Sequence, residues 1–247
     1  MTLVNIMPMA GKGKRFLIKK YKLPKPYIRI NHLPMFILSN LCMPKAEKNI
    51  FLYLKSHDKY FKKNVGKLSS LQNVCPIEVN KISNGQATTC LLAKDYINDN
   101  DKIFVHSCDS YIKFNKKLFN KLLNSNDILI FTTKPNEFHL MNQNSFGWVN
   151  IIDDSINKIT CKKVASNDPK NDKIIIGTFA FKNKEIFINS IKNIIKNKIK
   201  VNDEYYLDMA VSEALKKNIK ISIVEVDKYY SWGTPSEMEK FKKNTKL

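Results

Sequence analysis

Short hydrophobic runs recur along the chain and are separated by more polar segments. The runs LVNIM, NIFLYL, DKIFVHS, DILIFTT, KIIIGTFAF and IKISIVEV are rich in β-branched and aromatic residues, which is typical of buried strands. Helical spacing occurs between several of them. Apolar residues fall at i, i+3, i+4, i+7 and i+8 from Asp203 to Lys217, and Gln86 to Ile97 predicts another helix after the turn SNG. This alternation predicts an α/β fold whose mostly parallel sheet is flanked by helices.

The pattern changes between about 131 and 182, where strand-like runs follow one another without clear helices. Antiparallel strands are therefore expected in this part of the chain, which makes the predicted sheet a mixed one. No internal repeat, low-complexity tail or linker interrupts the sequence. The whole chain, residues 1–247, is therefore predicted to form a single domain.

Composition narrows the class of protein. Hydrophobic residues make up 43% of the 247, too many for a disordered chain, yet no run is long enough to cross a membrane and no signal-peptide pattern opens the sequence. The five cysteines include no C-x-x-C pair, and the four histidines are scattered, which argues against a zinc site. We expect a cytoplasmic protein without a membrane partner.

The net charge of +20 raises the question of a polyanionic partner. The lysines are spread through the whole chain, often beside asparagine, and no nucleic-acid-binding motif accompanies them. The charge therefore indicates a solvated surface with a bias toward anionic substrates. Nucleic-acid binding, which would weaken steeply with salt, is an alternative and is not expected.

The segment PMAGKGKRF follows the first predicted strand and has the composition of a phosphate-binding loop. Gly11 and Gly13 permit close backbone approach, and the basic residues Lys12, Lys14 and Arg15 surround them. The spacing excludes a P-loop, and Phe16 stands where a dinucleotide fingerprint needs its third glycine. A basic tight turn without a ligand is the alternative interpretation.

A carboxylate is expected at the same edge of the sheet as this loop. Asp109 follows the run DKIFVHS, and the carboxyl ends of parallel strands meet at one edge. A carboxylate opposite a phosphate loop is suited to a Mg²⁺ ion that bridges to phosphates. The alternative is an aspartate that only caps the following turn.

Six motifs in order resemble the sugar-phosphate nucleotidyltransferase family, and in particular its short capsule-biosynthesis branch. They are GKGKRF, PKP, GQAT, CDS, IIIGTFAF and WGTP, and the resemblance covers about residues 4–242. It implies a Rossmann-like single-domain fold and an in-line attack by an acceptor phosphate on the α-phosphorus of an NTP, with Mg²⁺ as cofactor. The implied partners are an NTP, with CTP favoured, and a phosphorylated small molecule such as L-glutamine phosphate; a homodimer is left open.

The same resemblance implies roles for individual residues. It implies catalytic roles for Arg15, Lys25 and Lys163, and metal binding by Asp109. The nucleotide is expected to contact Met9, Ala10, Gly11, Lys12, Gly13, Lys14, Gly85 and Gln86. The acceptor is expected to contact Gly147, Trp148, Lys162, Gly177, Glu204 and Trp232.

Two departures from the family pattern bear on these roles. Ser231 and Trp232 precede Gly233, whereas many relatives have an acid before the GT, so the second metal ligand is in doubt. Candidate replacements are Asp203, Glu204 and Asp208, whose alternative role is to enrich a helix N-terminus in acids.

The second departure is CKK in place of the family's E-K-P. Lys162 can only donate hydrogen bonds, which favours an acceptor with anionic or carbonyl oxygens over a bare sugar. Trp148 has packing as its alternative role. A sugar 1-phosphate pyrophosphorylase, another small cytidylyltransferase and a nucleotide-binding regulatory domain are the alternatives to the favoured activity.

Overall fold

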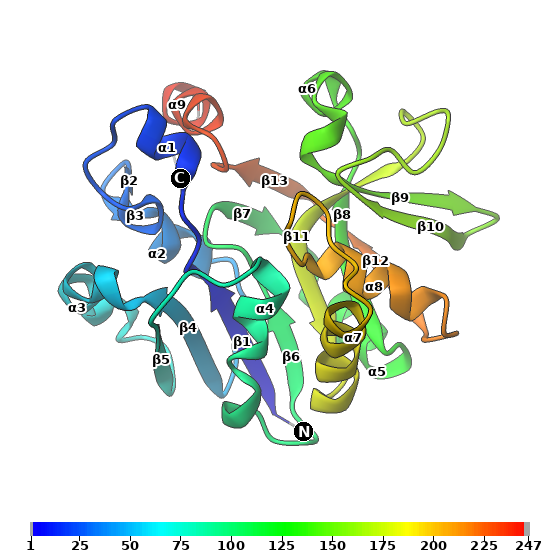
Figure 1. Cartoon of the computed structure of the whole chain (residues 1–247), viewed down its shortest axis with the longest axis horizontal. Coiled ribbons are helices and arrows are strands. Elements are labelled where there is room, and N and C mark those ends of the chain that lie inside the picture. The colour runs from blue at the N-terminus through cyan, green and yellow to red at the C-terminus, as the bar shows by residue number, and fades with distance from the viewer. Residues whose placement is uncertain (1, 245–247) are drawn as a thin grey trace.

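The computed structural model describes residues 2–244 and contains one nine-stranded sheet flanked by helices (Figure 1). Four parallel strands form one half of it in the order β5 (Val74–Val79), β4 (Lys48–Leu54), β1 (Leu3–Pro8) and β6 (Lys102–Val105). Ile6 and Met7 of β1 are both buried, one on each face, because side chains alternate along a strand.

The other half of the sheet mixes strand directions. The long strand β11 (Lys173–Phe181) runs antiparallel to β6, β8 (Ile128–Thr133) and β9 (Gly147–Ile152). Next to these lie β10 (Ser155–Cys161), antiparallel to β9, and β12 (Ile221–Glu225), parallel to β8. Within this sheet β10 and β11 run against the other described strands. The mixed, mostly parallel α/β sheet predicted from the sequence is confirmed, including antiparallel strands within 131–182.

Helices cover both faces of the sheet. Side chains of α4 (Gln86–Leu91), α7 (Lys184–Lys196) and α8 (Leu207–Leu215) pack on one face. Those of α2 (Met35–Asn40), α3 (Asp58–Val65) and α5 (Lys116–Ser125) pack on the other. The remaining elements lie around the carboxyl ends of the parallel strands (Figure 1): α1 (Lys14–Ile18), α6 (Glu137–Met141), α9 (Pro235–Asn244), the pair β2 (Arg29–Ile30) and β3 (Leu33–Pro34), and the pair β7 (Ser110–Lys113) and β13 (Lys228–Ser231).

Both predicted helices are shorter than expected. The segment from Gln86 to Ile97 is α4 followed by a single 3₁₀ turn, Lys94–Tyr96. The segment from Asp203 begins its helix only at Leu207, because Asn202 and Asp203 have φ of 49° and 60° and form a tight turn. Propensity alone does not reveal such a left-handed turn before a helix.

The sheet extends from Leu3 to Glu225. The single domain of residues 1–247 stays a prediction, and residues 1 and 245–247 lie outside the described part. Within residues 2–244, none of the helices combines the length and the apolar character needed to span a bilayer.

Candidate active site

The glycine loop after β1 lies directly against Lys25. Met9 and Ala10 are buried, and Gly13 then caps α1 with φ of 59°, a left-handed conformation that favours glycine. A Cβ atom on Gly13 would lie 2.9 Å from Cβ of Lys25, so a side chain there would displace the lysine. Around Gly11, in contrast, a Cβ would meet no atom within 4 Å. The loop is thus closed toward Lys25 at one glycine and open at the other.

Lys25 forms an ion pair with Asp109. Its Nζ donates to Oδ2 of Asp109 and lies 3.4 Å from the carbonyl oxygen of Gly233, and the two side chains keep 18% and 24% of their surface exposed. Pro24 and Pro26 flank the lysine, and Lys25 begins a short 3₁₀ turn, Lys25–Tyr27. Lys25 therefore touches both the glycine loop, at Gly13, and the carboxylate of Asp109, so the two lie at the same edge of the sheet as expected.

Both members of this pair are charged at neutral pH. Burial lowers the pKa of Lys25 and the nearby Arg15 also lowers it, but the carboxylate of Asp109 outweighs them, so the pKa lies above its usual value. Burial raises the pKa of Asp109, yet the Lys25 ammonium and hydrogen bonds hold that pKa below its usual value. The ammonium of Lys25 therefore stays positive beside the glycine loop, and the carboxylate of Asp109 stays ionised next to it.

Side-chain oxygens surround Gly233, next to Asp109. A Cβ atom on Gly233 would lie 3.4 Å from Oγ of Ser231, 3.5 Å from Oε2 of Glu237 and 3.6 Å from Oδ2 of Asp109. A side chain at position 233 would contact these three oxygens, whereas glycine leaves the space between them open. These are hard oxygen donors, and two belong to carboxyl groups, so the chemistry of the donors suits a Mg²⁺ ion. Within the described residues, however, no cluster of three or more His, Cys, Asp or Glu forms a ready-made metal site.

Glu237 lies beside this site and is not among the residues predicted from the sequence. Thr234 and Glu237 form a capping arrangement at the start of α9: the Thr234 hydroxyl donates to Oε2 of Glu237 at 2.8 Å, and the Glu237 amide donates back at 3.2 Å. The signal in the sequence was T-P-S-E directly after Trp232 and Gly233. This segment is a typical helix start, and its capping geometry places the carboxylate of Glu237 near Gly233.

Glu204 contacts the loop of Gly85 and Gln86, which is expected to bind the nucleotide. Gly85 has φ of 118°, and a Cβ there would lie 2.5 Å from the carbonyl oxygen of Tyr205 and 3.1 Å from Cβ of Glu204. Two backbone hydrogen bonds join the segments, from Ala87 to Tyr205 at 3.0 Å and from Tyr205 to Asn84 at 2.7 Å. Gly85 and Gln86 are therefore held by the turn before α8, and Glu204 is exposed beside them.

Asp208 lies against two of the expected acceptor residues. Its Oδ2 occupies the space that a Cβ on Gly147 would fill, so only glycine fits there. Burial raises the pKa of Asp208 to about 6, although the nearby Lys162 ammonium acts to lower it. Lys162 donates to the carbonyl of Ser145 and lies 5.6 Å from the ring of Tyr206. Gly147, Lys162 and Asp208 therefore form one cluster.

Both tryptophans of the expected acceptor set pack in the core instead of lining a pocket. Trp148 is fully buried, and its indole N–H donates to the carbonyl of Gln143 at 2.9 Å. Trp232 is fully buried among Phe16, Met238 and Phe241. Neither indole has surface to offer a ligand, so the expectation is corrected for both. The backbone of Trp232 still serves the site, because its N–H donates to the carbonyl of Asp109 at 2.7 Å.

The remaining predicted residues lie at the edges of this arrangement. Lys12, Lys14 and Arg15 are exposed around the loop, and Lys163 is exposed next to Lys162. Gly177 has φ of 72° in β11, and a Cβ there would lie 3.8 Å from the side chain of Ser107, two residues before Asp109. The structure brings no described carboxylate into an ion pair with Lys163.

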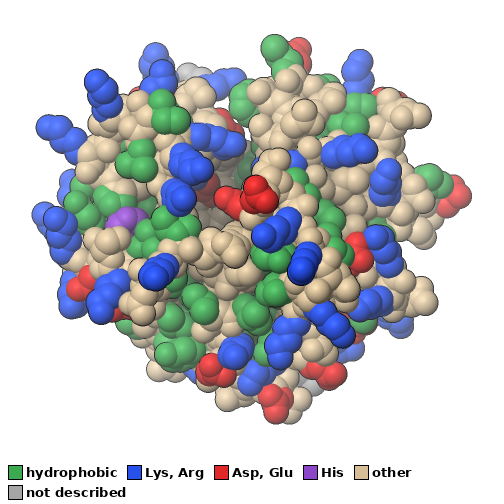
Figure 2. Space-filling model, viewed as in Figure 1, with side chains coloured by type: hydrophobic (Ala, Val, Ile, Leu, Met, Phe, Trp, Pro, Cys, Tyr) green, Lys and Arg blue, Asp and Glu red, His purple; other side chains and the backbone are tan. Residues whose placement is uncertain are grey.

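A hollow is visible between the α1–α9 side of the molecule and the α6–β9 side, and basic side chains are spread over the whole visible face (Figure 2). One cavity of about 410 Å³ lies beside α9 and is lined by Asn136, Phe138, His139, Tyr229, Tyr230, Ser231, Ser236, Glu237, Lys240 and Phe241. Ser231 and Glu237 connect it to the oxygens around Gly233. No single basic stripe of the kind that follows a nucleic acid is seen on this face.

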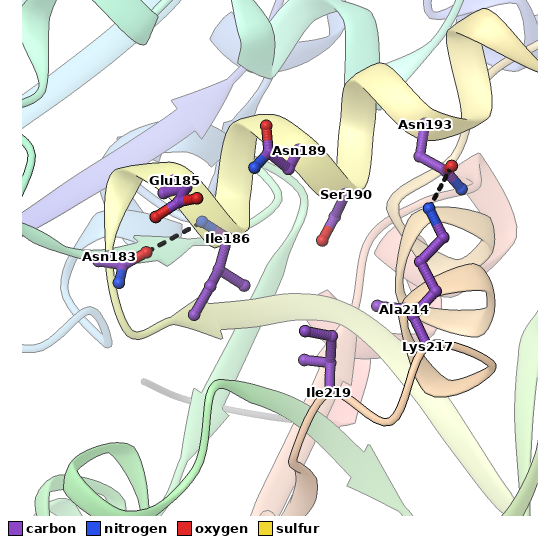
Figure 3. Close-up of a pocket in the computed structure, with 9 residues that line it drawn as sticks. All are labelled: Asn183, Glu185, Ile186, Asn189, Ser190, Asn193, Ala214, Lys217 and Ile219. Atoms are coloured by element: carbon purple, nitrogen blue, oxygen red, sulfur yellow. Dashed lines mark hydrogen bonds between the residues drawn. The ribbon is translucent and has the colours of Figure 1, made fainter.

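A second groove, of about 290 Å³, lies between α7 and the end of α8 (Figure 3). Three of its nine lining residues are asparagines, and Lys217 donates to Oδ1 of Asn193 at 2.6 Å. It contains none of the site residues predicted from the sequence, which lie instead around the Lys25–Asp109 pair and on the acceptor side.

Comparisons with solved structures identify the fold. The chain superposes with a TM-score of 0.77 on the nucleoside-diphosphate-sugar pyrophosphorylase from Vibrio cholerae, at 16% identity, over 97% of this chain and 100% of that one. It matches the inositol-1-phosphate CTP transferase from T. maritima with a TM-score of 0.73, at 15% identity, over 99% and 98%. The UTP-bound UGPase from Acinetobacter baumannii gives 0.72, at 15% identity, over 98% and 92%. No family model matches the sequence, and no match to a curated protein was found. At these identities the likeness establishes a shared nucleotidyltransferase-type fold along the whole chain.

Proposed function

We propose that this protein is a nucleotidyltransferase that joins an NTP to a phosphorylated small molecule and releases pyrophosphate. The observation that carries the proposal is the contact of Lys25 with both Gly13 and Asp109, which puts a fixed cation and an ionised carboxylate beside an open glycine loop. The fold shared with NTP-using transferases supports the same conclusion.

The reaction is an attack by an oxygen of the acceptor phosphate on the α-phosphorus, with departure of the β,γ-pyrophosphate. An anionic phosphate needs no general base, so this chain's contribution is alignment and charge neutralisation. Open space at Gly11 leaves room for the triphosphate. In this proposal Lys25 neutralises the charge that develops at the α-phosphoryl group, and Arg15 neutralises that of the leaving pyrophosphate. Lys163 holds the acceptor phosphate in line.

Asp109 and Glu237 are the carboxylates that would hold Mg²⁺, with Ser231 beside them. When bound, the ion supplies further neutralisation of phosphate charge. Glu237 thereby takes the place of the acid that relatives carry where this chain has Ser231. Asp208 is assigned elsewhere, since its carboxyl group is buried against Gly147.

Within this class we propose CTP as the nucleotide and L-glutamine phosphate as the acceptor, for capsule synthesis. Lys162 is the residue that favours such an acceptor, because an ammonium can bind carbonyl or carboxylate oxygens and cannot accept from sugar hydroxyls. A sugar 1-phosphate pyrophosphorylase is the second candidate. The observation that favours it is the fold shared with the Vibrio cholerae and Acinetobacter enzymes named above.

The test is a matrix of the four NTPs against phosphorylated acceptors, read by pyrophosphate release. We expect CTP with L-glutamine phosphate to give the highest kcat/KM, and Lys162→Glu to lower it more than it weakens CTP binding. Preference for a sugar 1-phosphate would eliminate the proposed acceptor while keeping the class. Absence of pyrophosphate release in every combination would eliminate the class itself.

A further inference from the structure

A buried polar network lies directly beneath the turn that presents Asp109. His106, the residue after β6, is fully buried, and so are Thr178 of β11 and Ser110 of β7. Nδ1 of His106 lies 2.7 Å from Oγ1 of Thr178, and Nε2 lies 3.2 Å from the carbonyl oxygen of Ser110. The imidazole therefore bridges β11 and β7 next to the turn that contains Asp109.

The protonation of this imidazole follows from its partners. Burial lowers the pKa of His106 to about 4, so the ring is neutral near pH 7 and has one N–H donor and one acceptor. The carbonyl oxygen of Ser110 can only accept, which requires the proton on Nε2. Nδ1 must then accept from the hydroxyl of Thr178. Cys42 adds a sulfur 3.3 Å from Nε2 and uses its own S–H on the carbonyl of Ser39 at 3.0 Å.

The two strands joined in this way are next to different parts of the proposed site. β11 contains Gly177, which is expected to contact the acceptor, and β7 begins directly after Asp109, which is proposed to bind the metal. Thr178 follows Gly177 at the irregularity in β11, where the pairing with β8 shifts register between Ile175 and Phe179. Ser110 follows Asp109. The turn between His106 and Ser110 has further support, since Oγ of Ser39 donates to the carbonyl of Ser107 at 2.6 Å and the Ser107 and Ser110 hydroxyls are 2.9 Å apart.

We infer that His106 is a positioning residue, which fixes the turn of Asp109 against the acceptor-side strand through the chain Thr178 hydroxyl, imidazole and Ser110 carbonyl. The inference rests on the proposed function for its effect on catalysis. Thr178 lies within the register shift of β11, between Ile175 and Phe179, and its hydroxyl reaches Nδ1 of His106 there. A small displacement of Asp109 would misalign the ion pair with Lys25.

The first test compares two buried threonines, of which only Thr178 bonds to His106 through its hydroxyl. Thr178→Val removes the hydroxyl that bonds to Nδ1 and is close in shape. Thr132→Val is the matched control, because Thr132 is also fully buried and its hydroxyl has no hydrogen-bond partner among the described residues. We expect Thr178→Val to lower kcat about tenfold with little change in KM for the NTP, and Thr132→Val to leave kcat unchanged. Equal kcat in the two variants would overturn the inference.

The second test replaces the imidazole by amides that keep one of its two contacts. In His106→Gln the side-chain amide can retain the donor to Ser110, and in His106→Asn it can retain the acceptor for Thr178. We expect kcat of the glutamine variant to stay closer to that of the wild type, because Ser110 is next to Asp109. Equal losses in variants of similar Tm would mean that the contact with Ser110 has no positioning role.

A third test uses ¹⁵N NMR, which reports the protonation and hydrogen bonding of His106 independently of any enzymatic activity. We expect the ¹⁵N shifts of His106 to report a neutral ring protonated at Nε2, and the amide of Tyr111, which shares a peptide group with the Ser110 carbonyl, to shift in Thr178→Val and not in Thr132→Val. A ring protonated at Nδ1, or no shift at Tyr111, would overturn the inference. If the wild type releases no pyrophosphate, the proposed function fails, and the NMR result still decides the positioning of the turn.

Discussion

Replacing Gly13 by alanine tests the contact on which the candidate site depends. The backbone at Gly13 has φ of 59°, and the new Cβ would stand 2.9 Å from Cβ of Lys25, closer than real Cβ atoms approach. The left-handed conformation costs a residue with a Cβ about 1–2 kcal/mol. Relief of the contact has to come from Lys25 or from the loop, because Cβ of Lys25 lies at the base of its side chain.

The expected consequences are separable. For a chain of this size a loss of about 1–2 kcal/mol lowers Tm by roughly 2–8 °C. A shift of Lys25 by a few tenths of an ångström up to 1 Å lowers kcat by as much as about 100-fold. Gly11→Ala is the matched control in the same loop, because its Cβ would meet no atom within 4 Å. We expect Gly11→Ala to keep Tm and Lys25 in place and to raise KM for the NTP, since the methyl group enters the space proposed for the triphosphate.

Thermal unfolding followed by circular dichroism, and initial rates of pyrophosphate release with each substrate varied, measure the two effects. A Gly13→Ala protein with the Tm and kcat of the wild type would refute the reasoning, because neither the backbone strain nor the contact with Lys25 would then exist in solution.

Three further predictions concern the acceptor side and the metal. Lys163→Ala should raise KM for the acceptor and lower kcat together, because the lysine both binds and aligns the attacking phosphate; a change in KM for the NTP alone would contradict this. Glu237→Gln should weaken binding of Mg²⁺ about tenfold in titrations with Mn²⁺ or Mg²⁺, while Glu239→Gln, at an exposed position two residues further along α9, should not. Asp208→Asn should flatten the pH dependence of stability. The folded-state pKa of about 6 lies above the usual value of 3.8, so the contribution of Asp208 to stability falls by about 3 kcal/mol as pH rises from about 4 to above 6. Denaturant unfolding at each pH should show this loss in the wild type relative to the asparagine variant.

The sequence predicted the sheet well because strand and helix periodicities are local signals. The first strand, the strand before Asp109 and the long strand around Gly177 all lie where their apolar runs indicated. The expectation that Asp109 shares an edge with the glycine loop also held, since it follows from the geometry of parallel strands.

What the sequence could not supply was the set of contacts made across the fold. Glu237 was missed because its approach to Gly233 depends on how α9 begins, and Trp148 and Trp232 were assigned to a pocket because a motif position does not reveal which way a side chain points. His106 gave no signal at all. Its role depends on Thr178, which lies 72 residues further along the chain.

Transfer of an isotope label tests the central claim most directly. The acceptor is prepared with ¹⁸O in its phosphate group and incubated with CTP, Mg²⁺ and the enzyme, and the products are followed by ³¹P NMR and mass spectrometry. Attack by an acceptor oxygen on the α-phosphorus predicts that all of the label is found in the nucleotide-linked product and that the released pyrophosphate is unlabelled. Label in the pyrophosphate, or release of inorganic phosphate without a nucleotide-linked product, would contradict the account.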